Sequence, residues 1–456
     1  MNWLTVLLCG LCCGGSVHAV WAVDSNESAT LSQADYRGWT AHRAANPFIS
    51  LHVVPEIGGR IMQFQLGKKE FLWVNPQLAA HKPPASGLAD DGSWLNYGGD
   101  KLWPAPQGWD NDEQWPGPPD SVLDGQPYAY EPLKLQTGEV GLRLTSGRDP
   151  RSGIQFSRTI RMDSDSTRVA FTATMTNVDS RPRRWGIWAH TQLDAQVPGE
   201  AAFNTRMRAW CPLNPHSQYP AGYRVIFGEP DNPSFRTDRE RGLVEVQYRY
   251  QVGKIGVDSA AGWVATVDGS AGAVLVQRFV FEPQAEYPDG ASVEFWHNGV
   301  GTIHAYGKDM TMENDPQKNP YVFESEVLSP YAHLEPGQSY SWSWEWFATT
   351  IGGDYPVLAC SPAGVVAEQL AATRRAQGVT LRGQLGVFYA GTIRAEFLDG
   401  DNRRVGTALL ANAVSPLEAV VLKADLPAPA TATAVRLVLL NSQGTEVGEL
   451  TRCNCR

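Results

Sequence analysis

One histidine is notable because it shares a predicted strand face with other polar side chains. In the segment RRWGIWAHTQLD (183–194), strand alternation predicts an apolar face formed by Trp185, Ile187, Ala189 and Leu193. The opposite face carries Arg184, Trp188, His190, Gln192 and Asp194. An imidazole beside an indole and an amide is costly to bury unless a ligand or a neighbouring residue satisfies the polar atoms. We interpret His190 as a functional residue, and a solvated outer face of the sheet is the alternative.

Two carboxylates share one face of another predicted strand, in YVFESEVLSP (321–330). Tyr321, Phe323 and Val327 form its apolar face, and Glu324 and Glu326 lie together on the other. Neighbouring carboxylates repel each other, which raises the pKa of one of them and suits it to general acid or base catalysis. The alternative is that both glutamates pair with lysines or arginines at the surface. The spacing alone does not decide between the two.

A third chemical signal is the aromatic stretch WLNYGGDKLWPAPQGWDNDEQWPGPPDSVLD (94–124). Its proline density argues against a regular helix and against a central strand, so we predict a long ordered loop. Indole faces can stack on the C–H faces of a sugar ring, while amides and charged groups bind its hydroxyls. The alternative is a loop whose tryptophans cap a β-sheet core. The candidate sugar-binding residues are Asn96, Lys101, Trp103, Gln107 and Trp109, together with Trp188 and Gln192.

Strands are the elements that must position these residues. Turn signals separate short alternating runs, and no sustained helical period occurs, so we predict an all-β fold. The predicted strands include 140–145, 154–162, 168–177, 184–193, 243–250, 263–267, 273–281, 293–297 and 321–328. Near residue 356 the chain changes to Ala/Val/Leu-rich alternation over about 100 residues, the size of an immunoglobulin-like sandwich. Within that part, residues 361–377 are expected to form one short helix.

Composition limits the classes of function. The chain has 456 residues, 44 glycines and 31 prolines, and a formal net charge of −10. This length favours two domains, and the glycine and proline content argues against coiled coils and helical repeats. The negative charge argues against nucleic acid as a partner.

The first 22 residues resemble a secretory signal peptide. They contain no charged side chain and have a short apolar run, followed by Ala19 and Ala22 as candidate cleavage sites. The run is too short to span a membrane. We therefore expect an exported protein, periplasmic or extracellular, without a membrane span. The predicted organisation is a signal peptide (1–22), a large β domain (23–355) and a C-terminal β-sandwich (356–456).

Four cysteines remain after the predicted signal peptide: Cys211, Cys360, Cys453 and Cys455. An even number in an oxidising compartment suggests disulfides. Because the last three lie at the two ends of the C-terminal domain, we expect a bridge from Cys360 to Cys453 or Cys455. A Cys-x-Cys metal site is the alternative.

Other metal signals are weak. His297 and His304 flank an Asn-Gly turn with Glu294 nearby, and Asp110, Asp112 and Glu113 share one loop. Neither set matches a known ligand ladder. We expect no metal and no other cofactor. Three tryptophans in the run SWSWEW, Trp342, Trp344 and Trp346, are expected to belong to the core.

Several segments together resemble the galactose-mutarotase-like (aldose 1-epimerase) superfamily, and in particular its DUF4380-type branch. These segments are GGRIMQFQLGKKEFLWVNP, NYGGDKLWPAPQ, KIGVDSAAGWVATVD, YPDGASVEFW and FESEVLSPYAHLEPGQSYSWSWEW. The resemblance covers roughly residues 35–350. It implies a β-supersandwich fold, in which two large sheets pack face to face.

The resemblance also implies an activity, the opening and reclosure of an aldose ring. By position, His190 would be the acid, Glu326 or Glu324 the base, and Arg60 a group that holds the sugar. Asp100 and Lys101 stand where such enzymes carry a further histidine. This difference suggests an acidic sugar held by Lys101 and Arg60, both of which should then face the cleft of His190.

Two alternatives to turnover remain open. A non-catalytic protein could bind a monosaccharide or glycan in the same cleft. A structural protein of the cell envelope could use its C-terminal domain to bind a protein partner.

Overall fold

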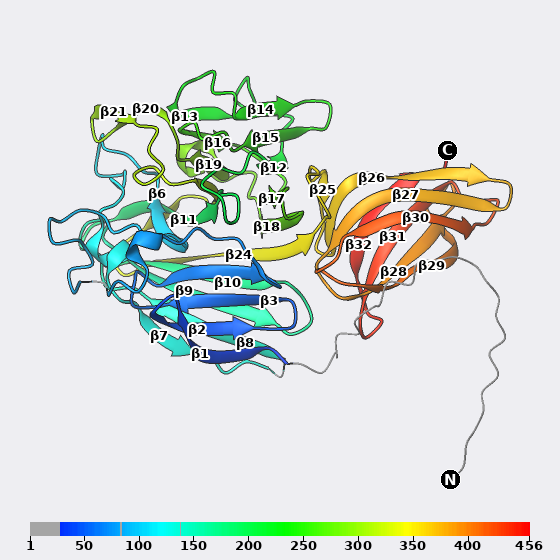
Figure 1. Cartoon of the computed structure of the whole chain (residues 1–456), viewed down its shortest axis with the longest axis horizontal. Helices are drawn as coiled ribbons and strands as arrows, with labels where there is room; N and C mark the ends of the chain where they lie inside the picture. Colours follow the sequence, from blue (N-terminus) through cyan, green and yellow to red (C-terminus); the bar gives the residue numbers. More distant parts are fainter. Residues whose placement is uncertain (1–27, 83, 137) are drawn as a thin grey trace, which may run out of the picture.

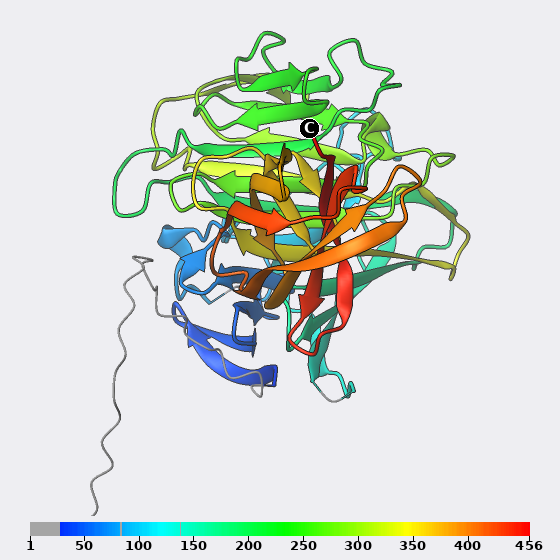
Figure 2. The ribbon, with the colours of Figure 1, turned by 90° about the vertical axis from the view of Figure 1, so that its right-hand side faces the viewer.

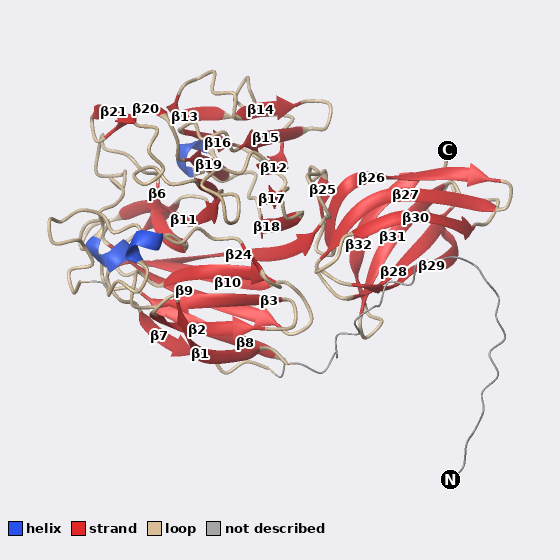
Figure 3. Ribbon diagram, viewed as in Figure 1, coloured by secondary structure: helices blue, strands red, loops and turns tan. Residues whose placement is uncertain are grey.

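The computed structural model describes residues 28–82, 84–136 and 138–456, and strands dominate it (Figures 1 and 3). Within these ranges the helical segments are three short turns: η1 (Pro76–Leu78), η2 (Ser121–Gly125) and η3 (Pro288–Gly290). No helix among the described residues has the length and apolarity needed to cross a membrane. The predicted signal peptide lies outside the described residues. The expected all-β fold is confirmed, and all nine strands predicted from the sequence are present.

The first large sheet carries the histidine and the two glutamates. Its strand order is β1-β2-β3-β4-β6-β11-β22-β19-β16-β13, with β5 beside β4 and β23 beside β11. The strands are β1 (Thr30–Tyr36), β2 (Trp39–Ala45), β3 (Ile49–Val54), β4 (Arg60–Leu66), β5 (Lys69–Glu70), β6 (Asp100–Ala105), β11 (Arg183–Asp194), β13 (Arg224–Gly228), β16 (Gly253–Val257), β19 (Val293–His297), β22 (Val322–Leu328) and β23 (Ala332–Leu334). All its pairings are antiparallel.

The second large sheet has the order β14-β15-β12-β17-β18-β24-β10-β9-β8-β7. Its strands are β7 (Ala129–Pro132), β8 (Glu139–Thr145), β9 (Ile154–Asp163), β10 (Val169–Asn177), β12 (Met207–Pro212), β14 (Phe235–Asp238), β15 (Leu243–Gln247), β17 (Trp263–Asp268), β18 (Ala273–Phe279) and β24 (Ser339–Thr350). A separate hairpin is formed by β20 (Gly301–Ala305) and β21 (Lys308–Met312).

The two large sheets pack face to face around the main core. The rings of Phe64 on β4 and Trp346 on β24 are 5.5 Å apart. Polar contacts also join the sheets, since Arg158 on β9 lies 2.5 Å from the carboxylate of Asp100 on β6. The three tryptophans of β24 are buried, as expected. This packing uses one face of the first sheet and leaves its other face available for a site.

The C-terminal strands form two four-stranded sheets that pack into a small sandwich (Figure 2, in which these strands face the viewer). One sheet has the order β25-β26-β27-β30 and the other β29-β28-β31-β32. The strands are β25 (Ala359–Cys360), β26 (Gly364–Arg375), β27 (Gly378–Val387), β28 (Gly391–Leu398), β29 (Arg404–Val414), β30 (Val420–Pro427), β31 (Ala434–Asn441) and β32 (Glu446–Asn454). The expected supersandwich followed by a small sandwich is therefore confirmed.

Two expectations about this C-terminal part are wrong. Residues 361–377 are mostly strand β26, because pairing with β27 outweighs the helical propensity of the local sequence, with register shifts near Glu368. The expected disulfide is absent as well. Among the described residues, Cys211, Cys360, Cys453 and Cys455 are all free thiols. Cys360 lies on β25, whereas Cys453 belongs to β32 in the opposite sheet of the sandwich.

Candidate active site

Strand register brings the predicted catalytic residues together on the open face of the first sheet. His190 on β11 pairs with Lys101 on β6, and Glu324 on β22 pairs with Gln192 on β11. On the far side of β22, Glu326 pairs with Glu294 of β19. Because side chains alternate along a strand, these polar residues all project away from the core. The neighbouring Ser325 points the other way, and Gln277 of the second sheet donates to its carbonyl oxygen at 2.7 Å.

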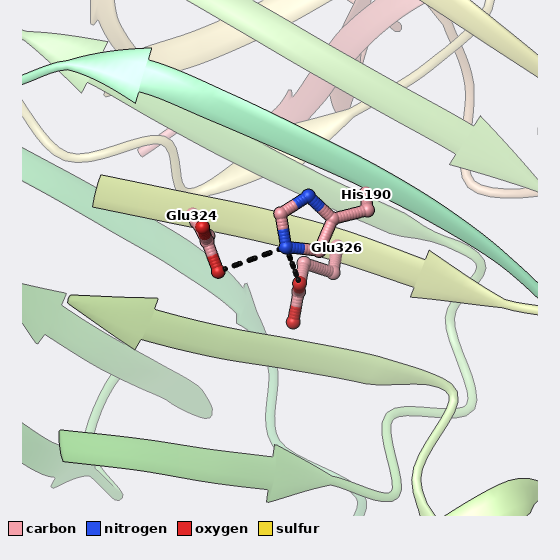
Figure 4. A group of neighbouring side chains, drawn as sticks. All are labelled: His190, Glu324 and Glu326. Atoms are coloured by element: carbon pink, nitrogen blue, oxygen red, sulfur yellow. Dashed lines mark ion pairs between the residues drawn. The ribbon is translucent and has the colours of Figure 1, made fainter. Parts of the chain in front are cut away.

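The imidazole of His190 lies between the two carboxylates. Its Nε2 is 3.1 Å from Oε2 of Glu324 and 3.3 Å from Oε1 of Glu326 (Figure 4). All three side chains are buried. Burial lowers the pKa of His190 well below its usual range, and the nearby ammonium groups of Lys101 and Lys254 lower it further. The ring is therefore neutral at pH 7 and able to exchange a proton with either carboxyl group.

Burial also raises the pKa of both glutamates above their usual range. Gln192 opposes this effect at Glu324, because its Nε2 donates to Oε1 of the carboxylate at 2.7 Å. At Glu326 no described residue donates a hydrogen bond to either carboxylate oxygen. Its opposing charge is Lys254, whose Nζ lies 3.6 Å away. Glu326 is thus the less stabilised carboxylate of the two.

The charges of the buried glutamates and lysines around the site do not sum to zero. Lys254 also lies 2.6 Å from Glu294, a third buried glutamate whose pKa is raised by burial. Lys101 is fully buried too, and burial lowers its pKa to about 7. Three carboxylates facing at most two ammonium groups leave at least one negative charge in excess. A buried excess charge favours proton uptake, in agreement with the raised pKa values of the three glutamates.

The site opens into a cavity of about 190 Å³ with aromatic walls. His190 and Glu324 line this cavity, whereas Glu326 lies behind them and does not. The other lining residues include the predicted Asn96, Trp103, Gln107, Trp109, Trp188 and Gln192, together with Trp94, Phe227, Lys254, Trp296 and Tyr306. Tryptophan faces beside amides and carboxylates suit a ligand that is both ring-shaped and rich in hydroxyls.

The loop that carries several of these tryptophans differs from the prediction in one respect. Residues 100–105 form strand β6 and pair with β11 despite Pro104. The rest is irregular, and Asp120 caps the turn η2 by accepting from the backbone N–H groups of Val122 and Leu123. This turn places Asp124 against the indoles. Trp115 belongs to the core as well, so the alternative of core-capping tryptophans holds for part of the loop.

Asp124 organises the aromatic wall. Its two carboxylate oxygens accept from Nε1 of Trp94 at 2.6 Å and from Nε1 of Trp103 at 3.1 Å. Arg60 lies 2.7 Å from the same carboxylate and is completely buried. The Trp103 ring lies 4.0 Å, centroid to centroid, from the His190 ring. Arg60 therefore positions Asp124, which positions the tryptophan that packs on the His190 imidazole.

The predicted contact of Arg60 and Lys101 with a sugar is not supported by their positions and remains a prediction. Neither side chain lines the cavity. Asp124 and the carbonyl oxygen of Gly98 occupy the Arg60 guanidinium, and Lys101 donates to Oε1 of Gln192 at 3.0 Å. The Lys101 ammonium also lies 4.8 Å from the ring centre of Trp103. Both cations lie behind the residues that line the cavity, and an acidic sugar remains an untested expectation.

Some residues of the site were not identified from the sequence. Lys254, Trp296 and Tyr306 line the cavity, and the first two come from strands β16 and β19. The sequence signal for Lys254 was a lysine between small and apolar residues in the run GKIGV (253–257). Strand alternation places its side chain on the other face of the strand from that of Ile255. Tyr306 lies in the turn of the β20–β21 hairpin, where its hydroxyl donates to the carbonyl oxygen of Pro118 at 2.7 Å.

A metal ion is a chemical alternative at the same place. Among the described residues, His190, Glu324 and Glu326 offer three ligand atoms within 4.8 Å of one another. The two buried lysines beside them disfavour a divalent cation. The alternative set of Glu294, His297 and His304 does not assemble, because His297 points into the core and its Nδ1 donates to the carbonyl oxygen of Gln251. His304 is exposed and pairs with Asp309.

Comparison with known proteins identifies a family. Residues 42–349 match the family described as "Domain of unknown function (DUF4380)". This confirms the branch that the sequence motifs indicated. No curated protein matches the chain.

Solved structures resemble the chain only distantly. A TPR-domain containing protein from Parabacteroides distasonis ATCC 8503 is 12% identical with a TM-score of 0.45, over 70% of this chain and 48% of that protein, so the chain spans about half its length. A galactose mutarotase-like protein from Clostridium acetobutylicum is 10% identical with a TM-score of 0.41, over 71% and 99% of the two chains. Another, from Lactobacillus casei ATCC 334, is 10% identical with a TM-score of 0.40, over 70% and 100%.

Proposed function

The chain belongs to the DUF4380 family, a family of unknown function, and we propose that it acts on a sugar by exchanging the two anomers of an aldose. The observation that carries this proposal is the position of His190 Nε2, within 3.1 and 3.3 Å of two buried carboxylates. A base and an acid are thereby held side by side at the bottom of a tryptophan-lined cavity.

Ring opening needs two proton transfers at adjacent oxygens. The anomeric hydroxyl and the ring oxygen are bonded to the same carbon, C1, so the base and the acid must lie next to each other. Glu324 and His190 meet this requirement, since both line the cavity and their nearest atoms are 3.1 Å apart. Acid–base catalysis works best when the catalytic pKa values lie near the working pH, and burial shifts the glutamates in that direction.

In the proposed reaction Glu324 is the base. Its carboxylate takes the proton of the anomeric hydroxyl as the C1–O bond to the ring oxygen breaks and C1 becomes a carbonyl carbon. Glu326 begins protonated and passes its proton to His190 Nε2, 3.3 Å away, and His190 delivers a proton to the ring oxygen, which leaves Glu326 as a carboxylate. Rotation about C1–C2 presents the other face of the carbonyl, and the two protons return as the ring closes. No net proton is gained or lost, so the site is ready for the next turnover.

The buried ion pairs support these roles. Gln192 holds Glu324 by a hydrogen bond and is itself held by Lys101. Lys254 lies near Glu326 and keeps a negative charge tolerable there after the proton has been delivered. Groups that are fixed before the reaction cost little reorganisation during it.

The direct test is anomer exchange measured by NMR on a panel of neutral aldoses. We expect exchange above the spontaneous rate, reduced at least 100-fold in Glu324→Gln and in His190→Ala, since positioned acid–base groups contribute about 10²–10⁴-fold. Glu240→Gln is the matched control, because Glu240 is an exposed glutamate outside the cavity. Acceleration that survives both site variants would overturn the proposed roles. Binding without acceleration would instead favour a non-catalytic sugar-binding protein.

We also propose that the protein is exported, on the grounds of the apolar first 22 residues alone. Cleavage after Ala19 or Ala22 would produce a chain that begins at Val20 or Val23. Mass spectrometry of the protein from the extracytoplasmic fraction of expressing cells tests this. A cytoplasmic protein that retains residues 1–22 would overturn it.

A further inference from the structure

A second cavity lies directly beside the site, and Trp109 is part of the wall of both. This second cavity measures about 430 Å³. Loop residues 108–112 and 114–116 line it, and the other lining residues are Arg151, Ser152, Arg181, Arg183 and Trp185. The Trp109 indole is held in place, since its Nε1 donates to the carbonyl oxygen of Pro116 at 2.9 Å. Its ring also packs against Tyr306, with 5.0 Å between centroids. The two cavities therefore adjoin across one fixed aromatic ring.

The arginines of the second cavity are already paired. Arg181 lies 3.3 Å from Asp112 and 3.3 Å from Asp179, and Arg183 lies 2.5 Å from Asp179. The guanidinium of Arg151 donates to two backbone carbonyl oxygens, those of Gly117 and Pro119. The cavity thus offers closely spaced donors and acceptors with little uncompensated positive charge. Neutral hydroxyl groups fit such a lining better than an anionic group does.

The small size of the site cavity also favours a ligand that extends beyond it. Ligand pockets usually measure about 300–1,000 Å³, and the site cavity of about 190 Å³ falls below that range. It can hold little more than one sugar ring. The adjoining cavity provides additional volume, and Trp109 adds partly exposed aromatic surface to it. A ligand that extends across Trp109 would use both.

We propose that the substrate is the reducing end of a neutral oligosaccharide, with the terminal sugar in the site cavity and the next sugar in the second cavity. This inference rests on the proposed function. Anomer exchange requires a free hemiacetal, which only the reducing-end sugar possesses. The next sugar must therefore be attached through a different hydroxyl of that terminal ring. It would lie between Trp109 and the paired arginines.

The experiment compares reducing disaccharides with their parent monosaccharides. NMR exchange rates are measured for cellobiose, galactobiose and mannobiose beside glucose, galactose and mannose. For at least one pair, we expect kcat/KM to be at least tenfold higher for the disaccharide. Arg181→Ala should bring this ratio close to one, whereas Arg239→Ala should leave it unchanged, because Arg239 is an exposed arginine that lines neither cavity. Equal or lower kcat/KM for every disaccharide would overturn the inference.

Calorimetric binding of the same sugars separates this inference from the proposed function. Exchange of monosaccharides without a disaccharide advantage would leave the proposed function intact and remove the second subsite. Tighter binding of a disaccharide that depends on Arg181, without any exchange, would keep the subsite and remove the proposed function. Neither exchange nor binding would overturn both.

Discussion

Glu326 is the least stabilised charge in the site, and its surroundings explain how a buried cluster can store a proton. Its carboxylate is fully buried, and no described residue donates a hydrogen bond to it. Its neighbours are His190 at 3.3 Å and Lys254 at 3.6 Å. Removing a carboxylate from water favours its protonated form. The lowered pKa of His190 has the same origin, so the imidazole and the carboxyl group compete for one proton.

These shifts predict the pH dependence of turnover. Burial raises the pKa of Glu324 and Glu326 above 4.5, the usual value. As the pH falls through the raised pKa of Glu324, the base becomes protonated and activity declines. As the pH rises beyond the raised pKa of Glu326, the donated proton is lost and activity declines again. We expect a bell-shaped profile of kcat/KM with both limbs above pH 4.5, measured between pH 4 and 10.

The raised pKa values of the two glutamates also make the stability of the fold depend on pH. Between pH 4.5 and the raised pKa, the folded state binds more protons than the unfolded state, so the free energy of unfolding falls as the pH rises. A flat activity profile across pH 5–9 would contradict the storage of a proton in this cluster.

Replacement of Asp124 is predicted to destabilise the fold. Asp124→Asn leaves the completely buried Arg60 without its charge partner, and an amide offers only one acceptor for the two indole N–H groups. Breaking a buried ion pair on one side costs about 3–5 kcal/mol, so we expect a loss of that size in urea denaturation. Glu131→Gln is the control, because its pair with Arg143 is exposed and such pairs contribute about 0–1 kcal/mol. Similar small losses in both variants would show that Asp124 is not a structural centre.

At the scale of elements, the hairpin β20–β21 closes one side of the site cavity. Ile303, Ala305 and Tyr306 line the cavity from this hairpin. Its two-residue turn, Tyr306 and Gly307, has φ values of 55° and 70°. Such turns favour Asn-Gly, and a tyrosine in this left-handed conformation is strained. The strain is offset by the contacts that Tyr306 makes with Trp109 and Pro118.

We therefore predict that Tyr306→Asn weakens sugar binding without lowering stability. The asparagine suits the turn, so the melting temperature should stay the same or rise. The loss of the aromatic contact with Trp109 should raise KM for the sugar at least fivefold. His304→Ala is the control on the same hairpin, since that side chain is exposed and lines no part of the cavity. An unchanged KM in Tyr306→Asn would show that the hairpin does not contribute to binding.

The elements also show where sequence reasoning succeeds. Alternation along 183–194 predicted that His190 shares a face with Trp188 and Gln192, and alternation along 321–328 predicted that Glu324 and Glu326 share a face, because the period of a strand is local information. That the two faces adjoin depends on the pairing of β11 with β22. The position of Lys254 in the site could not be predicted in this way, since it depends on the spatial strand order β22-β19-β16. The burial of Arg60 depends on Asp124, 64 residues later in the chain. Strand β26 forms against its local propensity because β27 pairs with it.

At the scale of the whole molecule, the C-terminal sandwich lies at the end of the large domain away from the β20–β21 hairpin (Figure 1). No residue after Glu324 lines the site cavity. Contacts between the two parts are apolar and extensive. Phe347 of β24 and Phe388, which follows β27, stack with 4.4 Å between ring centroids, and the backbone N–H of Thr167 donates to the carbonyl oxygen of Phe388 at 2.9 Å. We therefore expect the sandwich to affect the site only through stability.

Phe388→Ala tests this separation. Phe388 is completely buried, and replacing a core phenylalanine with alanine costs about 3–5 kcal/mol. Because the lost contacts join the two parts, we expect calorimetry to show two separate unfolding transitions in place of one. The folded variant should retain the kcat/KM of the wild type for anomer exchange. Leu417→Ala, at a partly exposed position of the C-terminal part, should change stability by no more than about 0.5 kcal/mol. A folded Phe388→Ala protein that has lost sugar turnover would mean that the sandwich shapes the site directly, across the interface that these two phenylalanines form.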